Sequence, residues 1–304
     1  MRALAHLPEL ASYQDEPRQR PSGSVGKNGF LRLGFQRREE RTVLTTLERR
    51  VPLLVQQALY WDEEMPGLAC VPMVTTSGCL LQGDRHTVEV DVGPRAQAHL
   101  TTQAATKIHS MDANFAAQTQ RFVLADQAYL EVLPDPLIPH ARSRFVSRTV
   151  ISVAPTATVL HAETLLPGRK HHKAEEMFGY DLFSSTVRAE RPSGEELFTE
   201  KLLVEPKKRD PRGVVVMGDF DVFANVLFLT PRAHADRVLE QVESRVELDA
   251  PWVAGVGRLP GDAGLVYKVL GRETAVVKQA VRSFWAVARR EVTGAALPDE
   301  FLWR

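Results

Sequence analysis

The sequence has little cysteine and no excess of charge of either sign. Its 304 residues include only two cysteines, Cys70 and Cys79, which is too few for the disulfide framework of a small secreted domain. This scarcity favours a reducing compartment, so we expect a cytoplasmic protein. Lysine plus arginine and aspartate plus glutamate both total 38, so no net charge draws the molecule to nucleic acid or to an anionic membrane.

Long apolar runs are absent as well. Residues 1–19 contain no apolar segment of the length that a signal peptide needs. The longest apolar stretch, residues 213–230, is interrupted by Asp219 and Asp221, which excludes a transmembrane helix there. We therefore expect binding neither to nucleic acid nor to a membrane.

What the sequence does contain is a series of short apolar runs separated by turn residues, a pattern typical of strands. Residues 14–28 are rich in charge, Pro, Gly and Ser, so residues 1–30 are predicted to be a flexible lead-in and residues 31–304 a single β domain. The clearest alternation is Val88, Val90 and Val92. A Gly-Pro turn and a second alternating run over residues 96–100 follow, which predicts a hairpin.

Further strands are expected along the rest of the chain, because β-branched and aromatic residues gather there between turn signals. They are predicted at residues 121–124, 128–133, 144–153, 158–164, 186–189, 197–204, 214–217, 222–229 and 265–270. Two segments have helical spacing instead, residues 231–247 and 274–292. The expected fold is therefore mainly β, with two α-helices near the carboxy-terminal part.

A group of histidines and acidic residues offers one candidate for chemistry. His161, His171, His172 and Glu175 supply imidazole and carboxylate, which are ligands for transition metals. One hypothesis is therefore a metal-dependent hydrolase that uses a bound ion to activate water. The alternative is a solvated basic loop, since two of these histidines are adjacent in a lysine-rich stretch.

Residues 77–107 form the most unusual segment. Gly78 and Gly83 bracket a short apolar run and indicate tight turns. Asp84 follows the second glycine and could cap that turn. Hydroxyl and amide side chains end the next apolar strand, namely Thr101, Thr102, Gln103 and Thr106. Such residues can line a wet passage or simply satisfy neighbouring backbone groups.

This segment resembles the central signature of the UreD (UreH) family of urease accessory proteins. The resemblance rests on Gly-Cys-Leu-Leu-Gln-Gly-Asp-Arg at residues 78–85 and Leu-Thr-Thr-Gln-Ala-Ala-Thr-Lys at residues 100–107. Further blocks in the same order extend the likeness from about residue 31 to the end. They include Leu-Glu-Val-Leu-Pro-Asp-Pro at residues 130–136, a Gly-Arg pair followed by Glu176 and Phe178, and Trp285 with Arg289 and Pro298. The signature positions are Gly78, Gly83, Asp84, Thr101, Thr102, Gln103, Lys107, Pro134, Gly168 and Arg169.

The resemblance implies a fold of stacked β-sheets, a β-helix-like sandwich, in a protein that is not an enzyme and holds no tightly bound cofactor. Members of the family are similar in binding UreF, in reaching the GTPase UreG through UreF, and in docking on apo-urease. Nickel is expected to pass transiently through an internal tunnel. By resemblance, the positions expected to line this nickel route are Asp84, Thr106 and Glu163, together with Asp135 and Glu176.

Two alternatives to the nickel route stay open at this point. Glu163 lies in an apolar strand, where a carboxylate needs water or a partner, so a salt bridge to Arg169 or Lys107 would account for it equally well. The whole chain could also be a plain β interaction module that has no part in metal transfer. Residues 53–55 with Tyr60 and Trp61 are candidates for either a partner surface or the core.

Overall fold

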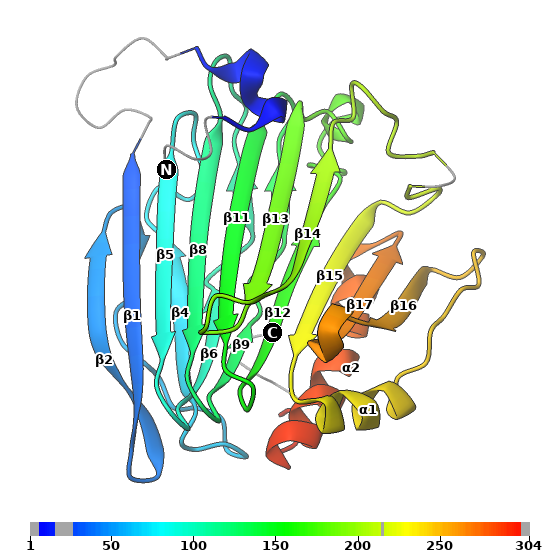
Figure 1. Cartoon of the computed structure of the whole chain (residues 1–304). Coiled ribbons are helices and arrows are strands. Elements are labelled where there is room, and N and C mark those ends of the chain that lie inside the picture. Colours follow the sequence, from blue (N-terminus) through cyan, green and yellow to red (C-terminus); the bar gives the residue numbers. More distant parts are fainter. Residues whose placement is uncertain (1–5, 16–26, 214–215, 299–304) are drawn as a thin grey trace.

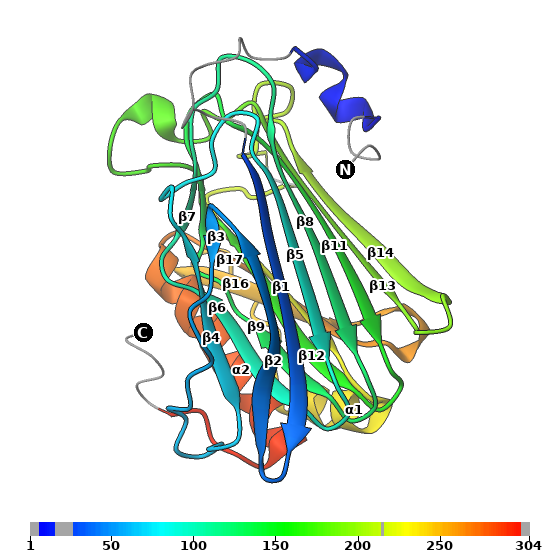
Figure 2. The same ribbon diagram turned by 90° about the vertical axis from the view of Figure 1, so that its left-hand side faces the viewer.

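Two β-sheets packed face to face make up most of the molecule (Figures 1 and 2). The computed structural model describes residues 6–15, 27–213 and 216–298. The first sheet has seven strands in the order β14-β13-β11-β8-β5-β1-β2. Their bounds are β1 Asn28–Arg38, β2 Arg41–Arg50, β5 Arg85–Val92, β8 Ala116–Leu124, β11 Arg144–Val153, β13 Leu182–Glu190 and β14 Glu196–Val204.

The second sheet has ten strands, and its main path is β16-β17-β15-β12-β9-β6-β4-β3. Two short strands, β7 and β10, pair with each other, and β10 also pairs with β12. The bounds are β3 Leu53–Leu54, β4 Ala69–Thr75, β6 Gln97–Thr102, β7 Thr106–Ile108, β9 Tyr129–Val132, β10 Leu137–Pro139, β12 Thr158–Leu165, β15 Val222–Leu229, β16 Trp252–Arg258 and β17 Gly264–Gly271.

The chain passes repeatedly from one sheet to the other. β5, β8 and β11 lie parallel in the seven-stranded sheet, and each leads into β6, β9 or β12, which lie parallel in the ten-stranded sheet. These successive turns of chain confirm the predicted stacked, β-helix-like sandwich. The predicted hairpin of residues 87–92 and 96–100 is wrong, because β5 and β6 enter different sheets. Both strands bury their apolar side chains in the space between the sheets, so facing each other across that space satisfies the same alternation.

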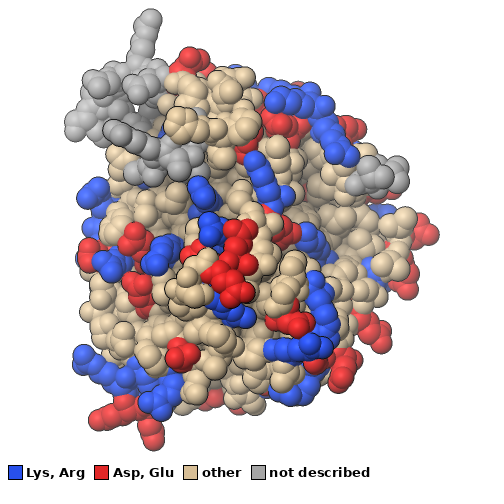
Figure 3. All heavy atoms as spheres, viewed as in Figure 1, with Lys and Arg blue, Asp and Glu red and all other residues tan. Residues whose placement is uncertain are grey.

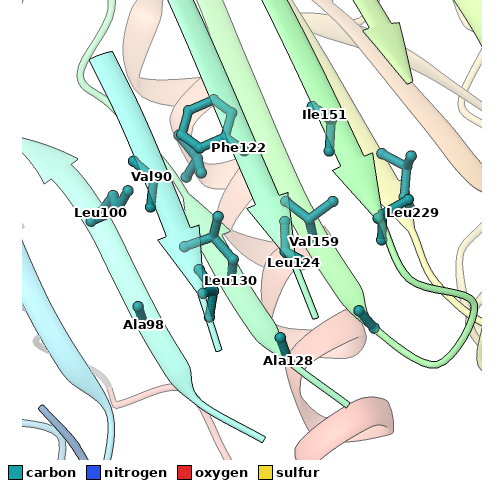
Figure 4. Close-up of a cluster of buried hydrophobic side chains, with 14 of the residues drawn as sticks. Val90, Ala98, Leu100, Phe122, Leu124, Ala128, Leu130, Ile151, Val159 and Leu229 are labelled. Carbon is teal, nitrogen blue, oxygen red and sulfur yellow. The ribbon is translucent and has the colours of Figure 1, made fainter. Parts of the chain in front are cut away.

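The main hydrophobic core fills the space between the sheets. Figure 4 shows Val90, Phe122 and Ile151 of the seven-stranded sheet pointing toward Leu100, Leu130 and Val159 of the other. All six side chains are buried. Their strands also supply Ala98, Leu124 and Ala128. This tightly packed region occupies one part of the sandwich and leaves another part for polar side chains.

Two α-helices pack on the outer face of the ten-stranded sheet (Figures 1 and 2). Helix α2, Thr274–Thr293, confirms the prediction for residues 274–292. Helix α1, Arg232–Gln241, is shorter than the predicted 231–247. Its pattern of valines continues to Val246, but Val242 is already extended and Arg245 forms an isolated bridge with Ala254 beside β16. The segment after Gln241 is therefore extended and pairs with β16 where further helical turns were predicted.

A buried ionic cluster holds α2 to the sheet. Arg289 is fully buried, and its guanidinium donates to Glu131 Oε1 and Oε2 at 2.8 Å each and to the Asp62 carboxylate. Glu131 also accepts bonds from Tyr129 and Trp285 at 2.6 Å. Although burial favours the protonated form, Arg289 holds the pKa of Glu131 well below its usual range. Glu131 is thus charged, and both Glu131 and Asp62 pair with the same buried cation.

The strand predictions missed seven strands, among them β3, β7 and β10, which have only two or three residues each. β1, β2, β4 and β16 were not predicted, because charged, glycine-containing or short apolar segments hide their alternation. The strand predicted at residues 214–217 falls partly outside the described residues, and Val216 and Met217 lie in a turn. Leu53 and Val55 belong to the core, whereas Tyr60 is 38% exposed.

Part of the predicted lead-in is packed against the domain. Residues Pro8–Tyr13 form a 3-10 helix, η1, and Leu10 is fully buried against Ala117, Val146 and Leu182 of the seven-stranded sheet. Residues 1–5 and 16–26 of the lead-in lie outside the described residues. The two other short 3-10 helices are η2 Ala174–Glu176 and η3 Pro260–Asp262.

Charge is evenly mixed over the face drawn in Figure 3, where blue and red spheres alternate over the described part of the seven-stranded sheet. Arg32, for example, lies within 4.0 Å of carboxylates on three other residues, Glu48, Glu89 and Asp91. The local pairing matches the zero net charge of the chain. Within the described residues, the helices are all too short or too polar to cross a bilayer.

Candidate functional site

The ten-stranded sheet is interrupted where its polar residues gather. β6 ends at Thr102 and β7 starts at Thr106, while β9 ends at Val132 and β10 starts at Leu137. The residues between these strands leave the sheet ladder and bond to one another. The Asp135 amide donates to Thr102 Oγ1 at 2.9 Å, and the Thr106 amide donates to the Pro136 carbonyl at 3.0 Å. The break in the ladder is thereby held in a fixed shape by hydrogen bonds between the loops.

A polar cavity of about 60 Å³ lies at this break, between the two sheets. We call it the chamber. The ten-stranded sheet contributes Thr102, Thr106, Asp135, His161 and Glu163, and the opposite sheet contributes Gln118, Gln120 and Ser147. Its volume is enough for a few water molecules. Three of the five predicted route residues, Thr106, Asp135 and Glu163, therefore line one chamber.

Glu163 is the most unusual side chain of the chamber. It is half-buried between the sheets, and its Oε2 accepts a bond from Ser185 Oγ at 3.1 Å. Neither Arg169 nor Lys107 pairs with it, and no other cation does so among the described residues. Burial raises its pKa to about 7; the bond from Ser185 lowers it and the neighbouring Glu200 raises it further. Glu163 is thus a carboxyl group that gains or loses its proton near neutral pH.

His161 lies two residues earlier on β12. It is 4% exposed, and its ring meets the Phe122 ring edge-on at a centroid distance of 5.9 Å. Burial lowers its pKa to about 4. The imidazole is consequently neutral at pH 7, so it places no positive charge in the chamber and keeps a nitrogen lone pair.

Two further cavities share lining residues with the chamber. One, of about 90 Å³, shares Met73, Thr102 and Thr106 with the chamber and reaches Gly78 and Cys79. The other, of about 430 Å³, shares Pro134, Asp135, Ala162 and Thr164 and reaches α2. The three cavities are thus neighbours around the break, with lining residues in common. Asp135 lies near α2, with its Oδ1 at 3.6 Å from Nζ of Lys278 on that helix.

Asp84 does not line this series. It is fully buried, and its two carboxylate oxygens accept the backbone N–H groups of Lys27 and Leu81 at 2.9 and 2.8 Å. Oδ2 also lies 3.8 Å from His86 Nε2. Gly78 and Gly83, which both precede Asp84, have φ angles of +70° and +78°, which favour glycine. The signature around Asp84 therefore builds a turn, as the capping alternative predicted.

Glu176 is likewise engaged elsewhere. Its carboxylate pairs with Arg169 and accepts the Ala141 amide at 3.1 Å, and the Arg169 bond lowers its pKa to about 2. Gly168 allows this arrangement, because it has a φ of +121° and a Cβ there would lie 2.1 Å from the Glu176 carbonyl oxygen. Gly168, Arg169 and Glu176 thus form one folded unit outside the chamber.

The remaining signature residues support the break. Thr101 Oγ1 donates to the Leu133 carbonyl at 2.8 Å, and the Gln103 amide donates to the Met73 carbonyl at 3.0 Å. Pro134 lines the chamber, and the Lys107 carbonyl accepts the Leu80 amide at 2.8 Å. These contacts are largely to backbone groups, so the signature residues mainly fix the backbone conformation at the break.

The hydrolase hypothesis is not supported by the geometry. His161 is buried between the sheets, whereas His171 lies in the loop after β12 with 81% of its side chain exposed and 3.9 Å from Glu273. His172 and Glu175 are exposed in the same loop. In residues 6–15, 27–213 and 216–298 there is no group of three or more His, Cys, Asp or Glu placed to hold a metal ion.

Sequence reasoning missed the wall that the seven-stranded sheet contributes. Gln118, Gln120 and Ser147 are inward-facing polar residues on β8 and β11, and Thr149 shares the inward face of β11. The interruption of an apolar alternation by Gln and Ser was the available signal. It could not show which residues on the other sheet these side chains would meet.

The class of fold is a stacked β-sandwich with a polar cavity between its sheets. Comparison with known sequences identifies the family of the chain. The family model described as UreD urease accessory protein matches residues 27–304, and the chain belongs to this family, whose members are accessory proteins rather than enzymes. It is similar to the urease accessory protein UreD 2 of Brucella suis biovar 1, with 55% identity over 300 residues covering 99% of each chain. It is also similar to the urease accessory protein UreD of Yersinia pseudotuberculosis, with 53% identity over 299 residues covering 98% of this chain and 93% of the relative.

Proposed function

We propose that this protein serves apo-urease as a non-enzymatic scaffold and gives nickel an internal route toward the urease active site. A urease accessory role follows from its family. The observation that supports the route is Glu163, a carboxyl group without a cationic partner among the described residues, in a polar chamber whose lining residues also border two neighbouring cavities.

The chemistry of the chamber suits passage better than storage. A cation that moves through a protein needs polar walls to replace part of its hydration shell, and contacts weak enough to release it. The chamber offers one unpaired carboxyl group, one neutral imidazole, and hydroxyl and amide groups. Because no three strong ligands converge among the described residues, tight chelation is not expected.

The partners belong to the same proposal. We place UreF on this scaffold, the GTPase UreG on UreF, and the urease apoprotein at the other end of the route, all in the cytoplasm. What supports a passage between partners is that the chamber shares lining residues with two neighbouring cavities. Nickel would be transient cargo, and no tightly bound cofactor is part of the mechanism.

The test is urease activation in cells that express the cognate urease gene cluster. Glu163→Leu removes the unpaired carboxyl group from the chamber and is expected to reduce both urease activity and the nickel bound per urease. The variant should still co-purify with its partners, because Glu163 lies between the sheets rather than on the surface. Glu89→Leu, a carboxylate on the outer face of the seven-stranded sheet, is the matched control and should activate urease normally.

Two outcomes would contradict the proposal. Full nickel loading without this gene would remove the accessory role itself. Normal loading by Glu163→Leu combined with Asp135→Asn would leave the accessory role intact but exclude the chamber as the route.

A further inference from the structure

A pair of histidines outside the chamber forms a second polar site. Ile108, the last residue of β7, is paired in register with Pro139, the last residue of β10. His109 and His140 follow these two residues directly. Since Ile108 faces the core, alternation along the strand turns His109 to the other side of the ribbon. The two imidazole ring centroids lie 5.2 Å apart at an interplanar angle of 51°.

His140 is a buried group whose hydrogen-bonding capacity is not used. It is 7% exposed, and its Nε2 is buried with no hydrogen-bond partner among the described residues. A buried ring nitrogen without a partner is costly, which makes it a candidate for a ligand. Burial, together with Arg169 and His109, lowers the pKa of His140. The neutral ring therefore retains a lone pair.

The spacing of the rings matches that of two imidazoles on one metal ion. With a metal–nitrogen distance of about 2.0 Å and tetrahedral angles, two coordinated imidazole rings have their centroids roughly 5 Å apart. The observed 5.2 Å meets this condition. Glu176 is close enough to affect His140 electrostatically and partly offsets the positive charge of Arg169 and Lys107.

We propose that His109 and His140 bind one divalent transition-metal ion of the kind that prefers imidazole, such as Ni²⁺ or Zn²⁺, separately from the chamber. Only two protein ligands are present, because no third His, Cys, Asp or Glu joins them in the described part of the chain. Water fills the other positions, so the ion is exchangeable. Metal binding here does not depend on the proposed nickel route, and either can fail alone.

The experiment is calorimetric titration of the purified full-length protein with NiCl₂. His109→Ala is the main variant, because His109 is exposed and its removal should leave the fold intact. We expect one class of site to weaken by about tenfold or more, which is about 1.4 kcal/mol. His140→Phe keeps the ring volume at the buried position and should give the same loss. The double variant His171→Ala/His172→Ala, in the neighbouring exposed loop, should bind as the wild type does.

A second readout identifies the residues directly. In NMR spectra of the histidine-labelled protein, paramagnetic Ni²⁺ is expected to broaden the ring signals of His109 and His140 at lower concentrations than those of His171 and His172. Unchanged titrations of His109→Ala and His140→Phe, or broadening confined to His171 and His172, would overturn the site. If the His109 and His140 variants lose nickel binding but still activate urease normally, the site is supported and is independent of the proposed nickel route.

Discussion

At the scale of single residues, the presence or absence of a partner separates acidic side chains that look alike in the sequence. Asp84 has backbone donors on both oxygens and Glu176 has Arg169, whereas Glu163 has only the Ser185 hydroxyl among the described residues. A buried carboxyl group with so little support favours its neutral form. Glu163 is therefore expected to destabilise the fold when ionised.

Glu163 should make stability depend on pH in a defined direction. Its folded-state pKa is raised to about 7 from the usual 4.5 of a glutamate, so the folded state binds the proton more tightly and this group's contribution to stability is lost as pH rises from about 5 to 8. Glu163→Gln should remove that dependence and stabilise the protein at pH 8 by up to about 3 kcal/mol. Urea unfolding of both proteins at pH 5 and pH 8 measures it. The exposed Glu48→Gln variant is the control, and an equal pH slope in all three proteins would refute the assignment.

Arg289 should be far more important for stability than its neighbour Arg290. Arg289→Met leaves Glu131 and Asp62 buried without their cation, which costs about 3–5 kcal/mol. Arg290 is exposed one residue further along α2, so Arg290→Met is expected to change stability by less than about 0.5 kcal/mol. Thermal and urea unfolding compare the two variants. Similar midpoints would mean that the cluster does not hold α2 in place.

At the scale of elements, local patterns predicted the secondary structure of each segment better than its pairing partner in a sheet. Helix α2 was predicted almost to the residue because its apolar stripe and its packing face agree. Strands β5 and β6 were predicted correctly as strands but placed in a hairpin, since alternation is the same for two strands in one sheet and for two strands facing each other. Which strand pairs with which depends on how all the turns of the chain are arranged in the two sheets.

The turn at Gly168 is an element that depends on one glycine. Gly168→Ala would place a methyl group 2.1 Å from the Glu176 carbonyl oxygen at a φ of +121°, so the turn that joins Arg169 to Glu176 should open. We expect a loss of about 2 kcal/mol or more. Gly255→Ala has open space around the added Cβ and should be neutral. Denaturant unfolding measures both, and equal behaviour would show that the turn tolerates a side chain.

The packed 3-10 helix η1 should stabilise the upper part of the seven-stranded sheet. Leu10→Ala removes most of a fully buried side chain and is expected to cost about 2–3 kcal/mol. Hydrogen exchange should then quicken in β8 and β11, on which Leu10 packs. Leu7→Ala, at a partly buried position beside it, should have a smaller effect. Unchanged exchange in Leu10→Ala would mean that η1 is not coupled to the sheet.

At the scale of the whole molecule, one exposed apolar region stands out. Val246 and Leu248 are 76% and 73% exposed and border a cavity of about 430 Å³ between β14 and the strands β15, β16 and β17. Exposed apolar patches favour self-association when no partner covers them. The isolated protein is therefore expected to associate through this region.

Val246→Ser/Leu248→Ser should reduce that association without changing the melting temperature. Light scattering against concentration measures association, and thermal unfolding checks the fold. Val51→Ser replaces a valine that is 64% exposed but lies outside the lining of this cavity, so it is the control. An equal reduction of scattering by the control would show that general surface polarity, not this region, governs association.

The sequence by itself determined the class of fold, the two helices and the family, because periodicity, turn residues and signature blocks are local properties of the chain. It also placed Thr106, Asp135 and Glu163 among the candidates, although it put Asp84 and Glu176 beside them. Only the tertiary structure decided which of these share a cavity, because residues far apart in sequence meet there. Gln118 of one sheet faces the chamber with Glu163 of the other, and that encounter is fixed by how the two sheets stack, which no local pattern encodes.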